Sequence, residues 1–184
     1  MKYFKKISVV LVAVVMTLMV MPIEGKAAST MRYIGDVNGD GSINSADQMA
    51  MLRYINGSET LDYLSLLASD VNGDNAINLD DLELLMEYVS GDIDEFSAGN
   101  YIIISNTSNG RLFGDVNGDG EITMSDVILI QRYIGGMASF DYLDLLAADV
   151  NGDNQVTNED VTMLQRYIAS LITSFPAGKS IVIG

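Results

Sequence analysis

Residues 115–126 read DVNGDGEITMSD, and this twelve-residue stretch decides how the chain folds. It places aspartate at positions 1, 5 and 12 and asparagine at position 3. The same pattern recurs at residues 36–47, 70–81 and 149–160. Oxygen ligands at positions 1, 3, 5 and 12, with a backbone carbonyl from position 7, are what a calcium ion takes from one short loop. A single copy could be an acidic turn, but four copies in register predict calcium binding.

The predicted ligands form four sets in the same order along the chain, and we number the loops 1 to 4. The sets are Asp36, Asn38, Asp40, Ser42 and Asp47 in loop 1; Asp70, Asn72, Asp74, Ala76 and Asp81 in loop 2; Asp115, Asn117, Asp119, Glu121 and Asp126 in loop 3; and Asp149, Asn151, Asp153, Gln155 and Asp160 in loop 4. Position 9 can reach the ion through water and carries Asn44, Asn78, Thr123 and Thr157. We therefore expect four Ca²⁺ per chain.

The loops come in two pairs that repeat along the chain. Asp70 follows Asp36 by 34 residues, and Asp149 follows Asp115 by the same interval. The second pair lies 79 residues after the first, and this offset continues outside the loops. The chain is therefore a tandem duplication of one module, with a further duplication inside each module. We expect module 1 at residues 31–104, a hinge-like linker at 105–110 and module 2 at 111–184, joined only by that linker.

A helix is predicted after each loop, so the expected fold class is all-α. Position 9 is Asn or Thr, which are good N-cap residues, and the acid at position 12 then favours the helix dipole. Apolar residues recur beyond it at helical spacing, and they indicate core packing more than a binding groove. Short helices are expected over residues 61–68 and 140–147, before loops 2 and 4. The segments before loops 1 and 3 are too short for helices.

One β-branched run follows the last helix of each module, at residues 101–104 in module 1 and 180–183 in module 2. Isolated strands of this kind invite edge pairing, and each has an apolar candidate partner at the start of its own module, Tyr33-Ile34 or Leu112-Phe113. We predict that each module closes with a two-stranded clasp. The alternative is a disordered tail.

Residues 1–28 resemble a secretory signal peptide: three lysines within the first six residues, an uncharged apolar run from Ile7 to Met21 and then a polar stretch that ends in small residues. The alternative is a membrane anchor, but the run is shorter than the roughly 18 residues of a spanning helix. We expect cleavage after Ala27 or Ala28 and an extracellular protein, held at a cell surface only through a partner.

The formal net charge of −15 argues against binding to nucleic acid or anionic lipid. The chain has no histidine and no cysteine, so neither a Ser-His-Asp nor a Cys-His catalytic site can form. Glycosidase chemistry needs two carboxylates across a cleft, whereas most aspartates here are assigned to calcium. We expect a protein that is not an enzyme.

The tandem loop–helix repeats resemble the dockerin modules of cellulosome components. The segments that carry the resemblance are Gly-Asp-Val-Asn-Gly-Asp-Gly at 35–41 and 114–120, Ala-Asp-Val-Asn-Gly-Asp at 148–153, and Gln-Arg-Tyr-Ile at 131–134 and 165–168. This resemblance implies two small modules that dock onto cohesin modules of scaffold proteins in polysaccharide-degrading complexes. We expect a monomer when unbound. The alternative function is a secreted calcium sensor or buffer with EF-hand-type loops.

In dockerins, loop positions 10 and 11 and the sixth residue after the loop commonly contact cohesin. Those positions are Ser45, Ala46 and Arg53; Leu79, Asp80 and Glu87; Met124, Ser125 and Arg132; and Asn158, Glu159 and Arg166. We expect the first-repeat residues of each module to dominate docking, because second-repeat residues include acids. One departure from the loop pattern is Asn75 or Asn154 at position 6, where Gly is usual for the sharp turn.

Overall fold

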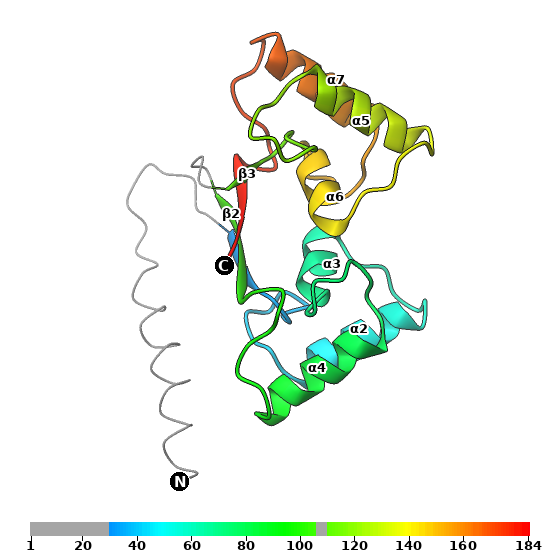
Figure 1. The fold of residues 1–184 in the computed structure, drawn as a ribbon, viewed down its shortest axis with the longest axis vertical. Helices are drawn as coiled ribbons and strands as arrows, with labels where there is room; N and C mark the ends of the chain where they lie inside the picture. Colours follow the sequence, from blue (N-terminus) through cyan, green and yellow to red (C-terminus); the bar gives the residue numbers. More distant parts are fainter. Residues whose placement is uncertain (1–29, 106–109) are drawn as a thin grey trace.

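The computed structural model describes residues 30–105 and 110–184, in which six helices and four short strands form two similar modules (Figure 1). The predicted signal segment lies outside these residues. In module 1 the elements are β1 (Thr30–Tyr33), α2 (Ser45–Ile55), α3 (Tyr63–Ser69), α4 (Leu79–Ser90) and β2 (Tyr101–Ser105). In module 2 they are β3 (Arg111–Leu112), α5 (Met124–Ile134), α6 (Tyr142–Ala148), α7 (Asn158–Ile168) and β4 (Ser180–Ile183). The mainly helical prediction is confirmed.

The helix that follows each loop begins where the sequence predicts. Asn44, Asn78, Thr123 and Thr157 are the N-caps of α2, α4, α5 and α7. In each case the position 12 aspartate completes a capping box by accepting the N-cap backbone N–H. One carboxylate therefore closes the loop and starts the helix.

The two predicted clasps form, and both are antiparallel. β1 pairs with β2, with Tyr33 opposite Tyr101, and β3 pairs with β4, with Leu112 opposite Ser180. Tyr88 stacks on Phe96 and Tyr167 tilts against Phe175, each with ring centroids 4.6 Å apart, so each last helix is tied to the turn that leads to the clasp. Both turns close with a short bridge, from Phe96 to Gly99 and from Phe175 to Gly178.

The expectation that the modules share only a linker is wrong. β2 also pairs antiparallel with β4, so the two clasps join in one four-stranded sheet of order β1-β2-β4-β3. Ser105, expected in the linker, is the last residue of β2 and lies opposite Ser180, while residues 106–109 lie outside the described residues. The central strands gain stability because Ile102 and Ile181 are buried there, each worth about 1.5–3 kcal/mol.

A second contact between the modules is made by their short helices. α3 packs against α6 in the middle of the molecule, between the pair α2 and α4 at one end and the pair α5 and α7 at the other (Figure 1). One continuous cluster of buried apolar side chains includes residues of both modules, such as Met51 and Leu85 in module 1 and Ile130 and Leu164 in module 2. The modules therefore form one packed body, and each keeps a helix pair at its outer end.

Candidate metal centres

The first carboxylate of each loop organises the loop backbone. In loop 1, Asp36 Oδ1 accepts the N–H groups of Gly39 at 2.9 Å and Asp40 at 3.1 Å, and Oδ2 accepts the N–H of Gly41 at 3.1 Å. Asp70 and Asp149 hold their loops in the same way, and Asp115 accepts the N–H groups of positions 5 and 6. Hydrogen bonds within the protein thus wrap the loop backbone around the position 1 side chain.

The last carboxylate closes the loop from the other side. Asp47 Oδ1 accepts the N–H of Asn38 at 3.1 Å, and its Oδ2 accepts the N–H of Asn44 at 2.9 Å. The position 12 carboxylates of the other loops accept the N–H groups of positions 3 and 9 in the same manner. Position 12 is therefore brought next to positions 3 and 9 in all four loops, and the assignment of the ligands stays a prediction.

Asparagine at position 6 takes the backbone conformation that glycine usually supplies. Asn75 has φ 64° and Asn154 has φ 61°, both in the left-handed region, where Asn is more tolerant than most residues. Their N–H groups donate to Asp70 at 2.9 Å and Asp149 at 2.8 Å, as Gly41 does to Asp36 in loop 1. The departure from glycine therefore leaves the loop turn intact.

The charge of the loop aspartates supports a cation site. The aspartates at positions 1 and 12 of all four loops are at most 4% exposed. Among the described residues, the ion pairs are Arg32–Asp62, Arg53–Glu59 and Arg111–Asp144, and none includes these eight carboxylates. A buried carboxylate without a compensating charge is costly. A divalent cation with oxygen ligands would offset that cost, so the donor set fits calcium.

Burial has a direct effect on these groups. It raises the pKa values of Asp36, Asp70, Asp81, Asp149 and Asp160 above the usual aspartate range. Backbone N–H donors lower the pKa values, but repulsion raises them further, as from Asp47 on Asp36 and from Asp160 on Asp149. The carboxylates of a loop therefore lie close enough to repel one another.

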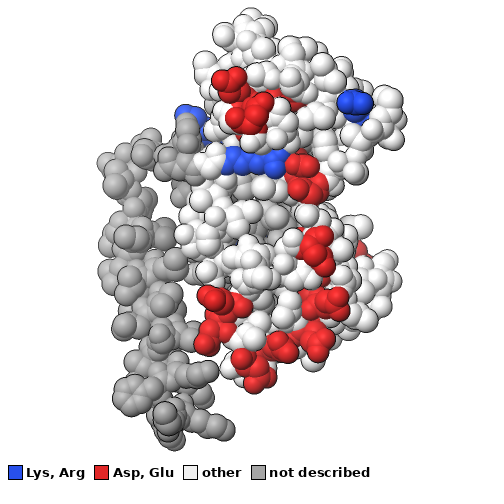
Figure 2. Space-filling model, viewed as in Figure 1, with Lys and Arg blue, Asp and Glu red and all other residues white. Residues whose placement is uncertain are grey.

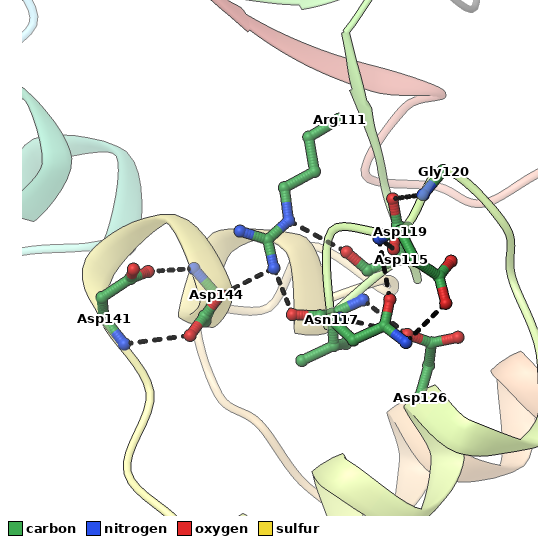
Figure 3. A network of polar contacts seen from close by, with 9 residues as sticks. Arg111, Asp115, Asn117, Asp119, Gly120, Asp126, Asp141 and Asp144 are labelled. Atoms are coloured by element: carbon green, nitrogen blue, oxygen red, sulfur yellow. Dashed lines mark hydrogen bonds and ion pairs between the residues drawn. The ribbon is translucent and has the colours of Figure 1, made fainter.

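Acidic side chains alone do not complete the ligand set. In the described parts of the chain, no three acidic side chains converge into a metal cluster by themselves. The predicted set also needs the Asn side chain of position 3 and the carbonyl of position 7. In loop 3, the Asn117 amide nitrogen lies 2.7 Å from Asp119 Oδ2, as Figure 3 shows. The amide is thus already beside the carboxylate with which it would share an ion.

The sequence did not predict an arginine that hydrogen-bonds the first two backbone carbonyls of loop 3. Arg111 Nε donates to the carbonyl of Asp115 at 2.9 Å, and one terminal nitrogen bonds the Val116 carbonyl and Asp144 Oδ1, the latter at 2.6 Å (Figure 3). Asp144 belongs to α6, so the arginine ties the start of the loop to the short helix of its module. The only sequence signal was an acid at position 144 where module 1 has Ser65.

The comparison with family models agrees with this geometry. The model described as "Dockerin type I domain" matches the chain twice, at residues 34–90 and 113–169. The chain belongs to the type I dockerin family. The two matches cover the loops and helices of both modules, so this is a tandem dockerin. Type I dockerins in general bind calcium and are non-catalytic modules.

Two solved structures are similar to part of this tandem dockerin. Each is the third cohesin of ScaC in complex with the ScaB dockerin from Acetivibrio cellulolyticus, displaying a type I interaction. They carry an IN to SI mutation in the N-terminal or the C-terminal helix of the dockerin. Each matches at 31% identity with a TM-score of 0.34, covering 36% of this chain and 93% of the other. Among curated proteins, none matches this sequence.

The predicted partner-binding residues lie on the outer helix pairs. Eleven of the twelve are exposed and Glu87 is half-buried; the exposed residues are Ser45, Ala46, Arg53, Leu79, Asp80, Met124, Ser125, Arg132, Asn158, Glu159 and Arg166. Asn158, Glu159 and Arg166 line one shallow depression on α7 with Thr162 and Met163. The role of these residues in docking stays a prediction.

Proposed function

We propose that this tandem dockerin is a secreted, calcium-dependent adaptor that docks two cohesin modules of scaffold proteins, one on each module. The observation that carries the proposal is the arrangement of the helix pairs. The modules join through α3, α6 and the sheet, which leaves α2 with α4 and α5 with α7 at opposite ends (Figure 1). Family membership supports cohesin as the partner at each end.

The outer helices carry exposed apolar side chains that a protein partner could cover. Leu79 and Met86 on α4 are 63% and 54% exposed, and Met124 and Ile128 on α5 are 50% and 52% exposed. Large exposed apolar groups that cluster on a surface often indicate a protein contact. Acidic side chains gather over both modules on the face drawn in Figure 2, which disfavours a polyanionic partner. Within the described residues, no helix is both long and apolar enough to cross a bilayer.

Calcium would act through the loops that start these helices. Four ions, one in each loop, would neutralise the buried aspartates and fix the first turns of α2, α4, α5 and α7. Metal binding to such sites contributes directly to folding. The docking residues at positions 10 and 11 lie in those first turns, so calcium would set their geometry.

Calorimetric titration with an isolated type I cohesin tests the proposal. We expect two cohesins per mature chain in calcium and none in excess chelator. The matched control is the double variant Asp36→Ala, Asp70→Ala, which removes position 1 ligands only from module 1 and should leave one cohesin bound. A chain that binds four calcium ions but no cohesin from a panel would be a buffer or sensor, and the adaptor proposal would fail.

A further inference from the structure

The two short central helices each begin with a tyrosine that reaches the other module. Tyr142, the first residue of α6 in module 2, accepts a hydrogen bond at its phenol oxygen from the backbone N–H of Ile77 at 3.3 Å. Ile77 is position 8 of loop 2, in module 1. Tyr63 begins α3 in module 1, and its phenol lies on the side of the backbone N–H of Val156, position 8 of loop 4, as a looser counterpart of that bond. The two tyrosines are therefore placed reciprocally, and the hydrogen bond itself is formed at Tyr142.

The electrostatic surroundings of both phenols agree with the packing of α3 on α6, which brings each phenol toward the opposite module. Burial raises the pKa of Tyr142, and the charges of Asp70 and Asp81 of loop 2 add to the shift. Burial likewise raises the pKa of Tyr63, with Asp149 and Asp160 of loop 4 contributing. Each ring therefore lies near positions 1 and 12 of the loop whose position 8 it contacts.

Position 8 is significant because of its peptide bond. The N–H of position 8 and the C=O of position 7 belong to one planar trans unit and point in opposite directions. The position 7 carbonyl is the predicted backbone ligand, from Ala76 in loop 2 and from Gln155 in loop 4. A phenol that holds the N–H on one side therefore directs the carbonyl to the other side, toward the ion.

We propose that Tyr63 and Tyr142 are positioning residues that orient the carbonyl ligand of the opposite module's second loop, so that each module helps to build a calcium site in the other. The inference requires that the loops bind calcium, but it does not depend on what docks to the helices. It also gives the joined sheet a role. The pairing of β2 with β4 and the bonds from Asn100 and Tyr101 N–H to the Gly184 carbonyl, at 2.7 and 3.0 Å, hold the modules in the register that the tyrosines need.

The test is a calcium titration of the mature chain followed by amide NMR. The N–H groups of Asn75 and Asn154 at position 6 report loops 2 and 4, because they donate to the first ligands Asp70 and Asp149. Gly41 and Gly120 report loops 1 and 3 in the same way. We compare the wild type with Tyr63→Phe and Tyr142→Phe, which remove one oxygen and keep the ring.

The expected result is a crossed pattern. Loss of the phenol oxygen should raise the calcium midpoint at loop 2 about 2- to 10-fold in Tyr142→Phe, where a hydrogen bond is removed. Tyr63→Phe should raise the midpoint at loop 4, by a smaller factor. Tyr167→Phe is the control, since Tyr167 packs on Phe175 inside its own module. Unchanged midpoints, a shift confined to the variant's own module, or an equal shift at all four loops would each overturn the proposal. A wild type whose amides do not respond to calcium would instead remove the premise shared with the adaptor function.

Discussion

Module 1 and module 2 have the same loops, helices and closing strands, but they hold their first loops differently. In module 2, Arg111 joins two carbonyls of loop 3 to the Asp144 carboxylate at 2.6 Å. In module 1 the equivalent Arg32 donates to the Ser65 hydroxyl at 2.5 Å and lies 3.9 Å from Asp62, which is more exposed. A close ion pair in one copy is replaced in the other by a hydrogen bond from the arginine to a hydroxyl group, with a longer and more exposed ion pair beside it.

Module 2 also has an aromatic contact that module 1 lacks. Tyr133 stacks on Phe140 in module 2, with ring centroids 4.5 Å apart and an interplanar angle of 5°. Leu61 stands at the position of Phe140 in module 1, so the matching pair of rings is absent there. Stacked rings and charged hydrogen bonds both add stability that does not depend on an ion. Module 2 should therefore keep more of its structure than module 1 when calcium is removed, although both contain two loops.

The largest loss of stability should come from removing β4, a strand that pairs with both modules. Truncation after Pro176 removes β4, which pairs with β3 of its own module and with β2 of the other. We expect both modules to lose stability, by more than about 4 kcal/mol in total, because buried Ile181 and two strand ladders are lost. Hydrogen exchange resolved by peptide would measure this in each module.

The control for the truncation is Ile183→Ser, in the same strand but at a side chain that is 40% exposed. It should cost less than about 1 kcal/mol. If exchange in module 1 is unchanged by the truncation, the sheet does not couple the modules, and they behave as independent units after all.

The sequence predicted what is local and repeated. Loop spacing located the four loops, the N-caps located the helix starts, and β-branched runs located the clasp strands. These features are readable because each depends on residues close together in the chain. The pairing of β2 with β4 was missed because each exit strand has two edges, and only one was needed for the predicted clasp. The sequence of residues 101–105 does not indicate which strand pairs with the second hydrogen-bonding edge.

The contacts missed around the loops have the same cause. Arg111 and Asp144 are separated by 33 residues, and Tyr142 is 65 residues from Ile77. The first pair meets only when module 2 has folded, and the second only when the two modules have packed together. Two signals were present in the alignment of the modules: the replacement of Ser65 by Asp144, and the tyrosine with which both copies begin their short helices. A position at which the two repeats differ, and a tyrosine hydroxyl that both repeats keep, can therefore indicate a tertiary contact.

A reciprocal exchange would test the difference between the first loops. Asp144→Ser should destabilise module 2 by about 2 kcal/mol, because hydrogen bonds to charged groups contribute about 1.5–3 kcal/mol and Arg111 would lose its carboxylate. Ser65→Asp should give a smaller gain in module 1, below about 1 kcal/mol, since a new pair must also desolvate. Chemical denaturation of both variants in calcium measures these changes. Equal and small effects in both directions would show that this ion pair does not distinguish the modules.

A third test compares the two repeats inside one module by their docking charges. Arg132 on α5 and Glu159 on α7 are both exposed. We predict that Arg132→Glu weakens cohesin binding to module 2 about tenfold, or about 1.4 kcal/mol, while Glu159→Lys changes it much less. Arg53→Glu should act on module 1 as Arg132→Glu acts on module 2. Calorimetry at two salt concentrations would measure this, and similar losses from the α5 and α7 variants would mean that either face can dock.

The smallest effect concerns acid, to which the two modules should respond alike. Burial raises the pKa values of Asp36, Asp70 and Asp81 in module 1 and of Asp149 and Asp160 in module 2. Without calcium, the folded chain therefore binds protons more tightly than the unfolded chain does. Its stability should increase as the pH falls through these raised values toward the ordinary aspartate value near 3.9, and decrease as the pH rises through them.

Calcium should reverse the sign of this pH dependence. A bound cation favours the ionised carboxylate, so protons compete with the ion and acid then destabilises the folded chain. Urea unfolding at pH 7, 6 and 5, in calcium and in chelator, would give two slopes of opposite sign. Asp74→Asn offers a check, because Asp74 adds to the repulsion on Asp70 and Asp81, and its removal should flatten the chelator slope. If stability in chelator instead falls with acid, as it should in calcium, then the pKa values of the buried aspartates are not raised. Their uncompensated charge would then no longer indicate a cation site.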